Sequence, residues 1–298
     1  MNPRLRFVAV LVATGAAWGS TQPLGKIAVS TGHGHFALIF WQLVIGALLL
    51  GAVLLVRRQG FAVTRARLAF AAMIAVIGTL VPNSTFYISV AQLPSGIMSI
   101  IIATVPLLSF PIAMALGMDR FGWLRVMGLL CGVAGVALIA LPEASLPSPA
   151  MAAFLPLAMV GPLFYAVEGN VVARWGTWGM SAVQTMFLVS LVGAVMALPL
   201  AVLSGQWFDP FADWGRAETA LVASSIAHAL AYATYVWLAA QAGAVFAAQT
   251  GYIVTGTGVI WAMLLLGERF SPFVWAALGV MMLGLFLVQP RARPVLAV

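Results

Sequence analysis

Ten long apolar segments make up most of this chain, and each is long enough to cross the hydrocarbon core of a bilayer, which takes about 20 helical residues. Backbone polar groups cannot stay unpaired in lipid, and no segment shows the alternation of a barrel strand, so all ten are predicted to be helices. The predicted fold is therefore all-α, a polytopic membrane protein with ten transmembrane helices. The spans are approximately residues 7–29, 36–56, 68–91, 95–117, 122–141, 150–173, 180–203, 217–240, 244–266 and 271–289.

The composition agrees with a membrane location. The chain is 63% hydrophobic and 7% charged, whereas soluble domains carry roughly 25% charged residues. Its net charge of +7 comes from Lys and Arg between the spans. These form no basic patch interleaved with aromatic residues, so the membrane surface is the expected partner and nucleic acid is not. The chain has a single cysteine, so it cannot form an intramolecular disulfide. This residue, Cys131, lies within a span.

The second half of the chain repeats the first at an offset of 149 residues. The most specific matches are Gln92 with Gln241 and the triplet Asp119-Arg120-Phe121 with Glu268-Arg269-Phe270. We therefore expect two repeats, residues 1–145 with the first five helices and residues 146–298 with the last five. Five is an odd number, so the second repeat must enter the membrane upside down, and a substrate site is expected at the interface of such inverted repeats.

Positive charges near the helix ends predict the orientation, because Lys and Arg are enriched in cytoplasmic loops. With the N-terminus inside, eleven arginines fall on the inner face and only Lys26, Arg216 and Arg269 on the outer face. Both termini are therefore expected in the cytoplasm. The inner-face arginines are Arg4, Arg6, Arg57, Arg58, Arg65, Arg67, Arg120, Arg125, Arg174, Arg291 and Arg293.

The connections leave no room for a soluble catalytic domain. The shortest, such as Gln241-Ala242-Gly243, predict antiparallel hairpins. The segment from Glu143 to Pro149 is the predicted linker between the repeats. The segment from Ser204 to Gly215 is rich in aromatic residues and is expected at the membrane interface.

Several motifs resemble the EamA modules of the drug/metabolite transporter superfamily. They are the Trp18-Gly19-Ser20 start with Lys26 closing the first span, the acidic-Arg-Phe triplets, and the Gly-rich last span of each repeat. Within that superfamily, the Trp18-Gly-Ser-Thr-Gln-Pro stretch and the Pro82-Asn83 pair are most similar to the YddG amino-acid exporters. The resemblance implies a carrier with a central cavity that exports aromatic and other neutral amino acids by alternating access. Many EamA modules place Arg in the second span, where this chain has Gln42.

Polar side chains in the third and eighth spans predict part of a substrate site. Thr79, Asn83 and Tyr87 lie on one face of the third span. His228 and Tyr232 occupy the positions equivalent to Thr79 and Asn83 in the eighth span. Polar residues within a membrane are costly and usually functional, which favours a cavity over the alternative of hydrogen bonds that only hold helices together.

The fourth and ninth spans carry residues that interrupt helices at corresponding places. These are Pro106 and Pro111 in the fourth span and Gly251, Gly256 and Gly258 in the ninth. Interrupted helices free backbone groups that can bind the carboxylate or ammonium of a zwitterion. The alternative is that the glycines allow close packing and the prolines only kink the helix.

Polar residues on the same two spans favour the functional interpretation. Gln249 and Tyr252 share one face of the ninth span, and Ser99 and Ala103 leave space for a substrate in the fourth. We therefore include Ser99, Gln249 and Tyr252 among the predicted binding residues.

The first and sixth spans open the repeats. Trp18 and Gln22 lie one turn apart in the first span, and Tyr165 corresponds to Trp18 in the sixth when the repeat offset is shifted by two residues. Their rings are suited to stacking or to attracting an ammonium group, although aromatic residues in membrane helices often only pack or anchor. Glu168 is an acid within the sixth span and a candidate for ion coupling. Its alternative is a local pair with Arg174 near the cytoplasmic end.

Catalysis finds little support in the sequence. His33, His35 and His228 form no metal-binding cluster with the acids at hand, and neither a catalytic triad nor a phosphate-binding loop is present. For His228, hydrogen-bonded helix packing and substrate contact remain open as alternatives. We expect no cofactor, no metal and no enzymatic activity.

Together these patterns predict a carrier in the bacterial inner membrane that exports amino acids and acts as a monomer. Two alternatives remain: a multidrug or other small-metabolite exporter of the same fold, and a polytopic membrane enzyme that uses His228. The sequence leaves the coupling ion open, and with Glu168 the single convincing intramembrane acid, facilitated diffusion is favoured.

Overall fold

The computed structural model describes residues 3–140, 146–242 and 244–288. These residues form helices joined by connections, with no β-strand in the described part of the chain. In chain order the elements are α1 (Pro3–Gly19), α2 (Thr21–Ala28), α3 (His35–Val56), α4 (Arg65–Ala75), the π-helical turn η1 (Val76–Leu80), α5 (Val81–Gln92), α6 (Ser95–Ile101), the 3-10 turn η2 (Ile102–Thr104), α7 (Val105–Ala115), α8 (Trp123–Ala140), the 3-10 segment η3 (Pro149–Phe154), α9 (Leu155–Trp175), α10 (Ala182–Leu203), α11 (Arg216–Ala242), α12 (Ala244–Ala248), α13 (Thr250–Leu266) and α14 (Pro272–Val288).

The lengths of the helices confirm an all-α polytopic membrane protein. Among the described residues, eight helices are at least 18 residues long and apolar enough to cross a bilayer. α14 is a shorter apolar helix of 17 residues, and α1 and α2 follow one another along the first predicted span. Together these helices account for the ten predicted spans.

Proline explains where two of the spans are interrupted. A proline has no N–H to donate to the carbonyl four residues earlier. Pro23 therefore leaves the carbonyl of Gly19 without its usual partner, and α1 ends at Gly19. Pro82 does the same to Gly78, which lies within the π-helical turn η1. Such turns in a membrane helix often lie near functional groups.

In the fourth span one of the two predicted prolines accounts for the interruption. The break is the 3-10 turn η2, which begins at Ile102, and Pro106 has no N–H to donate to the Ile102 carbonyl four residues earlier. Pro106 lies in the first turn of α7, where no helical N–H is needed, and Pro111 lies inside α7 without ending it.

In the ninth span the predicted interruption was misplaced. α13 runs without a break through Gly251, Gly256 and Gly258, and the interruption lies at Gln249, between α12 and α13. At Gly258 the packing alternative holds. A methyl group there would lie 2.4 Å from the Ser99 hydroxyl of α6, so the glycine lets the two helices approach closely.

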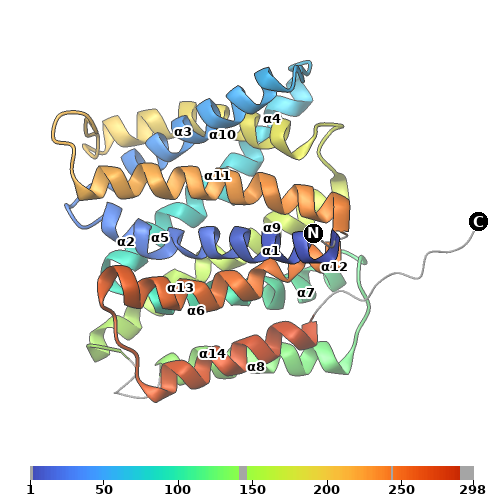
Figure 1. The fold of residues 1–298 in the computed structure, drawn as a ribbon, viewed down its shortest axis with the longest axis vertical. Coiled ribbons are helices and arrows are strands. Elements are labelled where there is room, and N and C mark those ends of the chain that lie inside the picture. The colour runs from blue at the N-terminus through green and yellow to red at the C-terminus, as the bar shows by residue number, and fades with distance from the viewer. Residues whose placement is uncertain (1–2, 141–145, 243, 289–298) are drawn as a thin grey trace, which may run out of the picture.

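Helices at equivalent places in the two repeats pack against each other. α3 packs on α10 along one edge of the molecule, and α8 packs on α14 along the other (Figure 1). Between these pairs, α1 contacts α11 and α13, and its counterpart α9 contacts α5 and α7. Each of these two helices therefore contacts the equivalent helices of the other repeat, as expected of two inverted halves.

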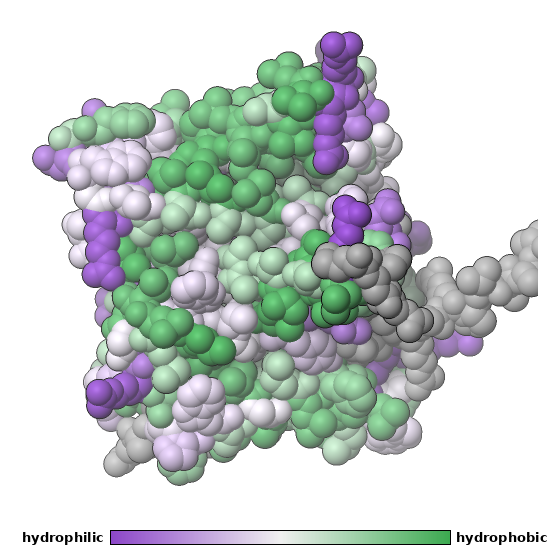
Figure 2. Space-filling model, in the orientation of Figure 1, coloured by the Kyte–Doolittle hydropathy of each residue, from purple (hydrophilic) through white to green (hydrophobic). Residues whose placement is uncertain are grey.

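The connections lie at two ends of the molecule. The end at the right of Figure 1 holds the start of α1 and residues 57–64, 116–122 and 176–181, and we call it the arginine-rich end. The opposite end holds residues 29–34, 204–215 and 267–271. Figure 2 shows hydrophilic residues concentrated at the two ends and a largely hydrophobic surface between them, as expected of a protein that lies across a bilayer.

Some predicted features lie outside the described residues. They include the end of the first repeat at residue 145, the start of the linker at Glu143, Gly243 between the eighth and ninth spans, and the arginines Arg291 and Arg293.

Candidate functional site

A hydrogen-bonded network joins three helices of the two repeats. In α3, the Gln42 side-chain oxygen accepts a hydrogen bond from Asn83 Nδ2 at 3.3 Å and one from the Tyr87 hydroxyl at 3.1 Å. In α9, the Tyr165 hydroxyl donates to Asn83 Oδ1 at 2.9 Å. Asn83 and Tyr87, both in α5, are buried. Three of the predicted site residues therefore meet around Gln42.

An aromatic cluster lies between α1 and α11. The Trp18 ring meets His228 edge-on, with ring centres 5.6 Å apart and planes at 89°. Trp18 also meets Tyr232 at 6.5 Å and Tyr235 at 6.0 Å, again with steep angles between the rings. Edge-to-face contacts of this kind fix ring orientation. The structure thus brings Trp18 together with the predicted residues of the eighth span.

Glu168 of α9 links these two groups. It lies within range of electrostatic interaction with Tyr165 of the network and with Tyr232 of the aromatic cluster. No hydrogen-bond donor among the described residues reaches its carboxylate, and its local partner is not Arg174, since neither of the two ion pairs in the described chain includes them. The acid therefore lies near a polar network and an aromatic cluster, and no cation of the described residues pairs with it.

The π-helical turn η1 makes room for this acid. A methyl group on Gly78 would lie 2.5 Å from the Glu168 carboxyl carbon, so only glycine allows the close approach. Thr79, the next residue in the turn, is also buried. Sequence reasoning identified Glu168 and Thr79 but did not foresee that Pro82 and the turn would place Gly78 against the acid.

Other predicted residues lie away from the two groups. Ser99 is fully buried where α6 meets α13, and its hydroxyl donates to the Ser95 carbonyl. Gln249 is exposed at the break before α13, and Tyr252 lines a cavity at the arginine-rich end. Gln22 is half-buried on α2, one turn beyond Trp18.

Gln42 was missing from the predicted site. The sequence marked it only as a departure from a family pattern, because a lone glutamine in an apolar span shows no periodic signal. Its role appears only once α3 is packed beside α5, where its oxygen accepts from both Asn83 and Tyr87.

A cavity of about 240 Å³ lies at the arginine-rich end, between α7, α8, α13 and α14. Its lining includes Phe110, Asp119, Arg125 and Tyr252. Arg125 forms an ion pair with Asp119, and its guanidinium lies 5.4 Å from the centre of the Phe110 ring. At this end α7 and α13 are therefore separated by open space.

At the opposite end, the fourth span, which contains α6 and α7, is joined to the ninth span, which contains α13. Glu268 follows α13, and its carboxylate accepts three hydrogen bonds from the start of α6: from Ser95 N at 2.8 Å, Ser95 Oγ at 3.0 Å and Gly96 N at 3.0 Å. Beside it, Lys26 Nζ donates to the carbonyls of Val90 at 3.0 Å and Leu93 at 2.6 Å. An acid at a helix N-terminus is favourable because it meets unpaired N–H groups and the positive end of the helix dipole.

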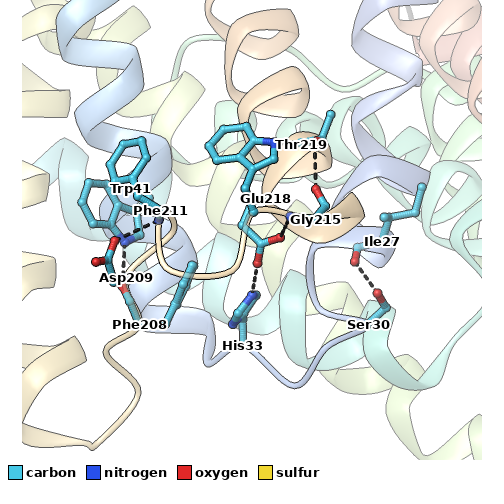
Figure 3. A network of polar contacts seen from close by, with 11 residues as sticks. Ile27, Ser30, His33, Trp41, Phe208, Asp209, Phe211, Gly215, Glu218 and Thr219 are labelled. Carbon is cyan, nitrogen blue, oxygen red and sulfur yellow. Dashed lines mark hydrogen bonds and ion pairs between the residues drawn. The ribbon is translucent and has the colours of Figure 1, made fainter.

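Further contacts tie the loops of the opposite end together (Figure 3). His33 Nε2 lies 2.5 Å from the Glu218 carboxylate, and its ring stacks on Phe208 with centres 3.8 Å apart. Trp41 Nε1 donates to the Phe208 carbonyl at 3.3 Å. The 204–215 connection is thereby held against the start of α3.

A second cavity, of about 320 Å³, lies at the opposite end near Lys26, Ala91, Arg216 and Leu266. Several of its lining residues are exposed, so it is a surface recess. Neither cavity is lined by Trp18 or Asn83. Among the described residues, no group of three or more His, Cys, Asp or Glu side chains is arranged to hold a metal ion.

Comparison with known proteins covers nearly the whole chain. The sequence profile of the EamA-like transporter family matches residues 5–141 and again residues 153–289. A search of curated protein sequences gives no match. One similar solved structure, described only as the crystal structure of a protein, is 18% identical with a TM-score of 0.62, over 96% of this chain and 97% of that chain. At this identity the likeness shows the fold and not the activity.

Proposed function

Because this chain belongs to the EamA-like transporter family, we propose that it exports amino acids, aromatic and other neutral ones among them, by alternating access. The family match identifies a membrane transporter and excludes the alternative of a membrane enzyme that uses His228. The substrate proposal rests on the chemistry of the groups around Glu168.

One observation carries this proposal: a half-buried acid lies near a hydrogen-bonding network and an aromatic cluster. No cation of the described chain pairs with Glu168, which supports binding of the substrate ammonium group. The amide and hydroxyl groups of Asn83 and Tyr165 are suited to the carboxylate. The rings of Trp18 and Tyr232 are suited to an apolar or aromatic side chain. Thr79, Tyr87 and His228 complete the proposed central site.

The proposed orientation places the arginine-rich end in the cytoplasm, since basic residues collect there. The separation of α7 and α13 at that end, and the Glu268 contact at the other, then correspond to an inward-facing state. Single cysteines at positions 33 and 61, in a Cys131→Ala background, test the orientation. We expect impermeant reagents to label position 33 from outside and position 61 from the cytoplasm, and the reverse pattern would contradict it.

Flux in proteoliposomes tests the substrate proposal. Labelled L-phenylalanine should enter in a saturable manner, and unlabelled L-phenylalanine trapped inside should accelerate that uptake, as expected of a carrier. Replacing Asn83 with Ala should lower the flux about tenfold or more, because it removes the link between Gln42 and Tyr165. Ser84→Ala, one position along α5, is the matched control and should transport normally. If Asn83→Ala transports like the control, the network only holds helices together.

An exporter of organic cations is the second candidate, because an acid beside aromatic rings also suits a cation without a carboxylate. Phenethylamine, which is phenylalanine without its carboxylate, separates the two. Preferential transport of the amino acid supports our proposal. Preferential transport of the amine supports the cation exporter.

The role of Glu168 in coupling is a separate prediction. If Glu168 carries a proton, Glu168→Gln should abolish the response to an imposed pH gradient yet leave exchange intact, because exchange needs no net proton movement. If the unmodified protein shows no gradient response, facilitated diffusion driven by cytoplasmic substrate is favoured.

A further inference from the structure

The cavity at the arginine-rich end is separate from the central site and has a charged wall of its own. It lies between the inner helices α7 and α13 and the outer pair α8 and α14. Its volume of about 240 Å³ is below the roughly 300–1,000 Å³ of pockets for drug-sized ligands. The space therefore suits a compact molecule.

Arg125 is the unusual residue of this cavity. It is only 8% exposed, and arginine is rarely buried unless its donors are satisfied. Its guanidinium has five N–H donors, yet within the described chain its one polar partner is Asp119, with Phe110 beneath it. The remaining donors have room for a planar carboxylate, which guanidinium binds in a two-pronged geometry.

The partner of Arg125 supplies the opposite charge. The side chain of Asp119 is 34% exposed, and besides Arg125 it accepts a hydrogen bond from the Arg120 backbone at 2.8 Å. A positive and a negative group therefore lie side by side on one wall. The rings of Phe110 and Tyr252 provide an apolar surface on the same cavity.

The matching region of the other repeat has no such site. Val274 stands at the position equivalent to Arg125 and is 1% exposed. Thr255, equivalent to Pro106, is also 1% exposed, and Ala103, equivalent to Tyr252, is 3% exposed. Among the described residues, the charged cavity is thus found at one end only. An element of the pathway that both repeats shared would instead be found at both ends.

We propose that this cavity is a loading site that holds an α-amino acid before it reaches the central site. The substrate carboxylate binds Arg125, its ammonium group binds Asp119, and its side chain lies against Phe110 and Tyr252. This inference rests on the proposed function, because it takes the same substrate class and places the site at the proposed cytoplasmic end. A zwitterionic lipid headgroup carries similar charges, but a bound lipid would also need space for its two acyl chains.

Protection from chemical modification tests the loading site without a transport measurement. Purified protein is treated with an arginine-selective dicarbonyl reagent, and modification of Arg125 is followed by mass spectrometry. We expect L-phenylalanine to slow the modification of Arg125 at least threefold. Phenethylamine should give no protection, because it has no carboxylate. Arg120, exposed and five positions away, is the internal control and should react at the same rate throughout.

The Asn83→Ala variant shows whether L-phenylalanine protects Arg125 by binding beside it or by binding at the central site. Protection that persists in this variant supports a distinct loading site, and protection that disappears overturns the proposal, since it then depends on the central site. Protection by phosphatidylethanolamine micelles in place of L-phenylalanine also overturns it. If the protein transports L-phenylalanine but Arg125 is unprotected, only the loading site fails. If Arg125 is protected but no amino acid is transported, the site stands and the proposed function fails.

Discussion

Asp119 and Glu268 occupy the same position of the two repeats but hold different partners. Glu268 reaches across to the other repeat and accepts three hydrogen bonds from the start of α6. Asp119 pairs with Arg125 of its own repeat. Part of the reason is in the sequence, since Ser95 supplies a hydroxyl donor where the second repeat has Ala244. The duplicated position therefore closes one end of the molecule and lines an open cavity at the other.

The neighbouring helices show the same contrast. At the opposite end, α6 packs on α13 with Ser99 and Gly258 in close contact. At the arginine-rich end, α7 and α13 border a cavity. Two halves with one architecture thus adopt unequal conformations, which agrees with the proposed alternating access.

The largest expected effect comes from removing the acid that joins the repeats. Glu268→Ala should free the start of α6 and favour opening of the opposite end by about 3 kcal/mol, on the order of a hundred-fold in the equilibrium, because hydrogen bonds to charged groups are strong. A cysteine in place of Ser99, in a Cys131→Ala background, reports this opening. An impermeant maleimide applied at the opposite end should label it on the order of a hundred-fold faster.

The matched control is Asp119→Ala, which removes an acid at the equivalent position. It should leave the labelling of position 99 nearly unchanged. Equal acceleration by both variants would show that the two ends are not distinguished by these acids.

Next in size is the close contact of α6 with α13. Gly258→Ala inserts a methyl group 2.4 Å from the Ser99 hydroxyl and should lower the free energy of unfolding by about 2 kcal/mol, as overpacking does. Thermal unfolding in detergent measures the loss. Gly256→Ala is the control, because nothing lies within 4 Å of the added methyl group. Equal stability of the two variants would mean that the contact is not tightly packed.

A smaller effect is expected from Lys26. Lys26→Met removes two hydrogen bonds to the Val90 and Leu93 carbonyls, which should favour opening by about 1.4 kcal/mol, or about tenfold in labelling at position 99. Arg216→Met also removes a cation from this end, but Arg216 is exposed and donates to Leu265. This control should change the labelling less than about twofold, and a larger change there than in Lys26→Met would contradict the assignment.

The smallest effect is expected from neutralising Asp119. Its side chain is 34% exposed, and asparagine keeps an oxygen that can accept from the buried Arg125, so Asp119→Asn should cost less than about 1 kcal/mol of stability. Thermal unfolding of Asp119→Asn and of Glu268→Gln, measured in parallel, compares the loss of stability at the two equivalent positions. A loss in Asp119→Asn as large as in Glu268→Gln would remove the contrast between the two ends.

The spans and the repeat could be predicted because each leaves a pattern along the chain. Apolar length identified the helices, and the offset between Gln92 and Gln241 identified the duplication. The stripe of Asn83 and Tyr87 was also visible, because helical periodicity places the two side chains on one face. The structure brings both of them to Gln42.

The partners across the helices could not be predicted in this way. Glu268 binds backbone N–H groups of α6, and a backbone group has no sequence signal. The break at Gln249 lies at none of the three glycines that the sequence offered as markers, although the break at η2 follows from Pro106. Tyr252 was predicted to bind substrate from its place on one face of the ninth span, and the structure places it in the lining of the cavity at the arginine-rich end.

α8 and α14 pack along each other, although they are the last helices of their repeats. During synthesis α8 enters the membrane while α14 has not yet been translated. The face of α8 with Gly128 and Gly135, which packs on α14, is therefore without that partner for more than a hundred residues of chain growth. Lateral contact with lipid or with an insertion chaperone must cover that face in the meantime. The packing of α8 is therefore completed only when α14 has been made.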